Sequence, residues 1–333
     1  MKIKILLFVL LSILISSCSA QQSNDVLVNL EKSFPDSRYL AAVGEGDSKN
    51  EAEKNAMAKL SLIFESNVDV NQTLNEHYSE FSDDENSSLT YEAQTTKRTN
   101  VQSEQKLLNV KYGKHGVDEN GNNYAVAYIN RSETSFIYEE KIANNNSSIF
   151  AMDNSAEMSD SKIFKYAAYN RASEMMNENI ELMKQLSIIS PNTSNFSDQI
   201  SKYESIYRKK GDVASSIKFV ISNESSKDVV NSLSSLLTSK GFKIADIGDF
   251  LITSTMKFEK VDLGRKETFY NWFINISVSN AQNETVFNFE KSGREGGISE
   301  SAVFARTKYS ANESLRKNFI TEFNGYLNSL LGN

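Results

Sequence analysis

The stretch YLAAVGEGDS at residues 39–48 decides the fold expected for the first folded part of this chain. Its apolar half predicts a short strand, and the glycines at positions 44 and 46 end that strand. Ser48 then occupies an N-cap position with Glu51 three residues later, which is the spacing of a capping box. The helix that follows carries one apolar stripe at helical spacing, made of Ala52, Ala56, Leu60 and Ile63. Because the alanines are small, this helix is expected to lie close against a sheet.

The chain downstream of this helix predicts the other strands of the same domain. Val68 and Val70 indicate a strand leaving the helix, and residues 89–112 are expected to be extended and exposed on one face. The Asn-Gly dipeptide at 120–121 is a strong turn signal. The apolar residues that alternate after the turn are Tyr124, Val126 and Tyr128. Residues 36–131 are therefore expected to form a small α+β domain.

Helical periodicity replaces this pattern in residues 132–211, which we expect to form a helical connector. The longest apolar stripe consists of Ile163, Tyr166, Ala167, Met175, Met176, Ile180, Met183 and Leu186. Pro191 ends it, since proline cannot continue a helix. The methionines would suit an adaptable binding groove, but ordinary core packing is the interpretation we favour.

A second α+β domain is expected over residues 212–333. Strands are predicted at about 217–221, 243–247, 250–258, 268–279 and 284–291, with a helix between the first two. A last helix is expected from Ser299 to about Leu331, with an apolar stripe made of Ala302, Ala305, Leu315, Phe319, Phe323 and Leu330. Grouped strands flanked by helices predict the α+β class. We expect two small antiparallel sheets, each covered by helices and joined by the helical segment.

The N-terminal residues predict where the protein is located. Lys2 and Lys4 precede an apolar run at residues 5–15, which is too short to span a bilayer and is typical of a secretory signal. The run ends in Ser-Ser before Cys18, which resembles the lipobox of bacterial lipoproteins. The resemblance implies that residues 1–17 are removed and that Cys18 is acylated, palmitate being one of the acyl groups. Residues 18–35 would then form the lipidated, flexible tether.

Composition and motifs argue against several classes of function. The net charge of −7 makes nucleic acid an improbable partner, and Cys18 is the only cysteine. The two histidines, His77 and His115, lie in polar segments, and without a cysteine partner they predict no metal site. The turn at residues 44–49 has Lys49 where a dinucleotide fingerprint needs its third glycine. We therefore expect no catalytic residues, no metal and no cofactor.

Arg294 is the one other candidate for an interaction site. It lies in the run SGREGG at residues 292–297, which predicts a flexible, exposed loop before the last helix. Such an arginine could hold an anion or a carboxylate of a partner. The alternative is that this run is a hairpin-to-helix connection that needs glycine torsions.

Residues 39–48 and the alanine-spaced helix after them resemble the LPP-twenty family of bacterial lipoproteins, over about residues 36–131. The resemblance implies an envelope lipoprotein with a small α+β domain and no established catalytic residues. The chain differs from short members of that family by its helical connector and second α+β domain.

We expect a non-enzymatic module, anchored to a lipid bilayer through acylated Cys18, that interacts with an envelope protein or with the peptidoglycan of the cell wall. Ser19 follows the cysteine, which by analogy with common sorting rules favours the outer membrane. One alternative is a periplasmic small-ligand carrier or enzyme with a site between the two α+β domains. Another is a structural protein that contacts peptidoglycan.

Overall fold

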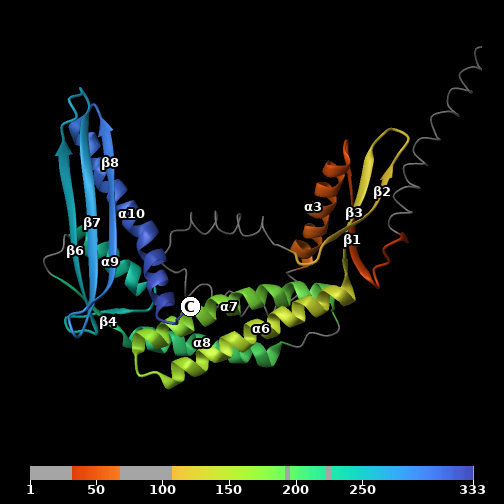
Figure 1. Cartoon of the computed structure of the whole chain (residues 1–333), viewed down its shortest axis with the longest axis horizontal. Coiled ribbons are helices and arrows are strands. Elements are labelled where there is room, and N and C mark those ends of the chain that lie inside the picture. Colours follow the sequence, from red (N-terminus) through yellow and green to blue (C-terminus); the bar gives the residue numbers. More distant parts are fainter. Residues whose placement is uncertain (1–31, 68–106, 192–195, 223–226, 333) are drawn as a thin grey trace, which may run out of the picture. The chain divides into compact units, whose positions relative to one another are not determined.

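The computed structural model describes residues 32–67, 107–191, 196–222 and 227–332. It divides the chain into two compact units, and each is described by itself (Figure 1). Both units combine helices with a sheet, so the predicted α+β class is confirmed. The predicted strand at Val68 and Val70, and most of the predicted segment 89–112, lie outside the described residues.

The first unit contains a three-stranded antiparallel sheet in the order β1-β3-β2. Its elements are β1 (Tyr39–Gly46), α3 (Lys49–Asn67), β2 (Lys111–Val117) and β3 (Asn123–Asn130). Strands β1 and β3 pair along their whole length, from Tyr39 opposite Asn130 to Gly46 opposite Asn123. In the described part of the predicted extended segment, residues 107–110 lie outside any strand, and β2 begins only at Lys111.

Helix α3 packs closely against this sheet because of one glycine. A Cβ at position 44 would lie 2.1 Å from the backbone nitrogen of Ala56 and 2.2 Å from the carbonyl oxygen of Ala52. Any other residue in β1 at this position would push the helix away. The predicted stripe is confirmed at its first three positions, but its fourth position is Phe64, which is fully buried, whereas Ile63 is only half-buried. Phe64 continues the four-residue spacing of Ala52, Ala56 and Leu60.

The predicted capping box forms with one change of partner. The backbone N–H of Glu51 donates to Ser48 Oγ at 3.3 Å. In return, the Glu51 carboxylate accepts from the N–H of Asp47 at 3.1 Å, one residue before the expected donor. Both bonds satisfy N–H groups that a helix start would otherwise leave unpaired.

The hairpin between β2 and β3 turns at the predicted Asn-Gly pair. Gly121 has a φ of +85°, which glycine adopts without steric cost. Asp118 organises the turn, because its carboxylate accepts from the N–H groups of Asn120 at 2.9 Å and Asn122 at 2.8 Å. It also accepts from the hydroxyl of Tyr124 at 3.2 Å. These bonds enclose a carboxylate that is 8% exposed.

Three long helices follow, α6 (Arg131–Met158), α7 (Lys162–Ile189) and α8 (Ser197–Ser216). Helix α7 ends two residues before Pro191, as predicted. Met176 and Met183 are fully buried, which confirms core packing for these two methionines. Helices α6 and α7 each contribute residues to both units.

The second unit contains a five-stranded sheet in the order β5-β4-β6-β7-β8. Its elements are β4 (Lys218–Ile221), α9 (Lys227–Thr238), β5 (Lys243–Ile244), β6 (Phe250–Val261), β7 (Thr268–Asn280), β8 (Thr285–Gly297) and α10 (Glu300–Ser329). The prediction of a purely antiparallel sheet was wrong, since β4 runs parallel to β5 and β6. Helix α9 carries the chain back between β4 and β5, and such a crossover brings the next strand in parallel.

Helix α10 packs on β7 and β8, and its predicted apolar stripe is confirmed in part (Figure 1). Leu315, Phe319 and Phe323 are buried as predicted, and Leu330 is half-buried. Ala302 and Ala305 are exposed, so their assignment to the stripe was wrong. The buried residues recur at every fourth position, and they are Val303, Thr307, Ala311, Leu315, Phe319, Phe323 and Leu327. On the sheet they face four buried side chains that alternate along β7, namely Trp272, Ile274, Ile276 and Val278.

Candidate functional site

Arg294 lies in a strand and not in a loop, so the prediction of a flexible loop was wrong. It belongs to β8, where it stands opposite Asn271 of β7. Its Nε donates to Oδ1 of Asn271 at 2.8 Å. The side chain remains exposed on the surface of the sheet.

The glycines around Arg294 serve aromatic rings and not unusual torsions. A Cβ at position 293 would lie 2.5 Å from the ring of Trp272, and one at position 296 would lie 2.4 Å from the ring of Phe269. Neither Gly293 nor Gly296 has a positive φ. Rings that lie across strand glycines stabilise such sheets.

One face of the second sheet carries exposed side chains and is covered by none of the described elements of the second unit. We call it the open face, and its central residues are Thr253, Thr255, Lys257, Asn271, Phe273, Asn275, Asn288, Glu290, Ser292 and Arg294. Most of these side chains are polar, and two pairs of them bond across strands. Arg294 bonds to Asn271, and the amide of Asn275 donates to Glu290 at 2.8 Å. Such a face offers hydrogen bonds and both signs of charge to a partner.

A hollow of about 680 Å³ lies in the first unit, where the segment before β1 meets the start of α6 and the end of α7. Arg131 is one of the residues that line it and donates to the carbonyls of Ile188 at 2.9 Å and Ile189 at 2.8 Å. A third bond reaches the carbonyl of Asp36 at 2.8 Å. Burial lowers the pKa of Arg131, although nearby Asp36 opposes this. This guanidinium stabilises the negative end of α7, so it is occupied structurally.

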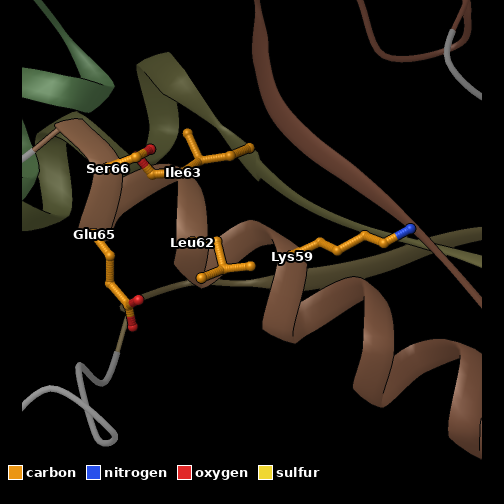
Figure 2. Close-up of a pocket in the computed structure, with 5 residues that line it drawn as sticks. All are labelled: Lys59, Leu62, Ile63, Glu65 and Ser66. Carbon is orange, nitrogen blue, oxygen red and sulfur yellow. The ribbon is translucent and has the colours of Figure 1, made fainter. Parts of the chain in front are cut away.

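A second hollow, of about 520 Å³, lies along the last turns of α3 (Figure 2). The side chains of Lys59, Leu62 and Glu65 point in different directions, and Leu62 is 57% exposed. Among the described residues that line this hollow, Lys59 is the one cation, and its ammonium donates to the carbonyl of Val43 at 3.0 Å. The groups therefore do not converge on a ligand, which a binding pocket requires.

One charged cluster in the second unit resembles a catalytic arrangement. Lys209 lies 2.7 Å from Asp153 and 2.8 Å from Glu157, and the hydroxyl of Tyr169 donates to Glu157 at 3.3 Å. Burial would lower the pKa of Lys209, but the two carboxylates raise it above its ordinary value. Burial, aided by Glu157, raises the pKa of Tyr169 to about 12. At neutral pH both groups keep their protons, and the ion pairs of the cluster link α8 to α6.

Of the two histidines and the cysteine considered in the sequence, the structure describes only His115. His115 lies in β2, 2.8 Å from Glu53, whereas His77 and Cys18 lie outside the described residues. Within the described ranges, no three metal-ligating side chains come together as a metal site would require. None of the helices in those ranges has an apolar stretch that could cross a membrane.

No protein-family model matches the chain, and no curated protein matches it. Among solved structures, it is similar to the secreted protein HP1454 from Helicobacter pylori, with 13% identity and a TM-score of 0.42, over 84% of this chain and 96% of that one. It is also similar to a minor lipoprotein from Acinetobacter baumannii, with 10% identity and a TM-score of 0.25, over 34% and 94% of the two chains. The lipoprotein GNA1162 from Neisseria meningitidis gives 8% identity and a TM-score of 0.21, over 29% and 96%.

Proposed function

We propose that this protein is a bacterial envelope lipoprotein that binds another envelope component and catalyses no reaction. One observation carries the proposal. Lys2 and Lys4, the apolar run at residues 5–15 and the Ser-Ser pair before Cys18 together have the form of a lipoprotein signal. Acyl chains on Cys18 would hold the body at a membrane surface, and the outer membrane is the one we propose.

The folded body supports a binding role through its surface. The open face presents polar side chains of both charges on a sheet held rigid by a large aromatic core. Rigid sheets can present a surface without the cost of ordering it on binding. By contrast, the charged groups with catalytic potential, Arg131 and Lys209, are bonded within the fold.

The partner that we propose is an envelope protein, and crosslinking in intact cells tests this. The full chain is crosslinked, purified under denaturing conditions and analysed by mass spectrometry. We expect adducts that contain a second envelope protein and that are absent without crosslinker. A pull-down on purified sacculi distinguishes a protein partner from peptidoglycan. Retention on sacculi without a protein adduct would mean that the partner is peptidoglycan and not an envelope protein. Recovery of this chain alone, as monomer or as homodimer, with no retention on sacculi would contradict a binding role.

A further inference from the structure

Strand β8 is a long edge of the second sheet. It extends over the thirteen residues Thr285–Gly297 and has β7 as its single neighbour in the sheet. The two strands stay in register from Val278 opposite Phe287 to Thr268 opposite Gly297. In the described part of the chain, α10 bonds to the backbone of β8 only at Gly296, whose carbonyl accepts from Arg306 at 3.2 Å. An edge of this length offers unpaired backbone groups to another strand.

We propose that β8 pairs antiparallel with β8 of a second copy of this chain, with Ser292 opposite itself. Glu290 and Arg294 lie two residues on either side of Ser292, so all three side chains share the open face. A two-fold axis at Ser292 places each Glu290 opposite Arg294 of the other copy. Opposite charges in directly opposed positions favour this register. The two sheets join into one continuous sheet across residues 287–297.

The charged groups that the pairing needs are available. Glu290 and Arg294 are exposed, and neither forms an ion pair with any described residue. Asn275 and Asn271 of β7 each bond one atom of these side chains, Oε1 of Glu290 and Nε of Arg294. The second carboxylate oxygen and the terminal nitrogens of the guanidinium are left to meet the other copy. The neighbouring strand thus orients both charges.

Another register also matches opposite charges, but it uses charges that are already engaged. With Gly293 opposite itself, Lys291 would stand opposite Glu295 of the second copy. Lys291 already lies 2.5 Å from Glu322 of α10, and Glu295 accepts from the hydroxyl of Ser310 at 2.7 Å. Lys291 and Glu295 both face α10, so pairing through them would compete with these contacts. The register at Ser292 uses Glu290 and Arg294 on the open face, so it breaks no contact with α10.

A disulfide test measures the register directly. In the full chain carrying Cys18→Ala, an added cysteine is the only thiol, so the result does not depend on lipid anchoring. Ser292→Cys is expected to give a disulfide-linked dimer under mild oxidation, because opposed Cα atoms in a sheet are about 4.5–5.5 Å apart. The control is Asn288→Cys on the same strand and face. Its two copies would stand about 27 Å apart in this register and should not link.

Charge reversal tests the contacts that set the register. Glu290→Arg or Arg294→Glu alone puts like charges opposite each other and should weaken the dimer by about tenfold or more, measured by analytical ultracentrifugation. The double variant restores opposite charges and should recover most of the affinity. Circular dichroism confirms folding of each variant. Equal linkage of Asn288→Cys and Ser292→Cys, absence of a Ser292→Cys dimer, or a double variant weaker than both singles would overturn the proposal.

Discussion

Single glycines decide how closely the elements of this protein approach each other. Gly44 brings α3 onto β1, while Gly293 and Gly296 make room for the rings of Trp272 and Phe269. The sequence made the first of these predictable, because small residues recur at helical spacing directly after it. The other two could not be predicted, since the rings that need them lie on a neighbouring strand, 21 and 27 residues earlier in the chain, and only the register brings them together.

Replacing Gly44 tests this contact. Gly44→Ala should lower the free energy of unfolding by about 1–3 kcal/mol or more, because the new methyl group meets rigid backbone atoms of Ala52 and Ala56. Urea unfolding followed by circular dichroism measures it. The control is Gly325→Ala on α10, where a Cβ would meet nothing and a helix gains about 1 kcal/mol. A Gly44→Ala variant as stable as the wild type would show that α3 can move away freely.

At the level of the elements, polar side chains stabilise the turns and the helix ends. Burial would raise the pKa of Asp118, but the bonds from Asn122, Asn120 and Tyr124 lower it below its ordinary value. A carboxylate with a lowered pKa stabilises the folded state above its unfolded pKa. This stabilisation is lost as the pH falls through the folded pKa. The β2–β3 hairpin should therefore weaken in acid.

Asp118→Asn tests the sign of this effect. The variant should be less stable than the wild type near neutral pH, and the difference should narrow as the pH falls from about 4 towards 2. Urea unfolding midpoints of the wild type and the variant, measured at several pH values, show how the stability difference changes with pH. Glu119→Gln is the control, because Glu119 is exposed and bonds to no described residue. A difference that stays constant with pH would mean that the charge of Asp118 does not stabilise the turn.

The elements themselves were largely predictable, and the exceptions have physical causes. The capping box at Ser48, the Asn-Gly turn and the helix end before Pro191 depend on local chemistry that the sequence displays. The direction of β4 depends on its pairing with β5 and β6, and the residues that α10 buries in its first turns depend on its packing against the sheet. Neither contact can be read from the local sequence. The predicted alanines of α10 face solvent because its contact with the sheet repeats every four residues, starting at Val303.

At the scale of the whole molecule, fold and function were predictable to different degrees. The α+β class followed from the grouping of strands and helices. The candidate interaction site did not, because Arg294 was assigned to a loop, whereas β8 carries it on a sheet edge opposite Asn271. Cys18 lies outside the described residues, so its acylation stays a prediction that depends on the sequence signal.

The most direct test of the central claim is the chemistry of Cys18 in cells. Full chains are expressed with an alkyne-tagged palmitate, and the label and the N-terminal peptide are analysed by gel fluorescence and mass spectrometry. The account predicts a labelled protein whose N-terminus is acylated Cys18, no label in Cys18→Ala, and full label in the control Ser19→Ala. An unlabelled wild type with residues 1–17 still attached, or a free thiol at Cys18, would contradict it.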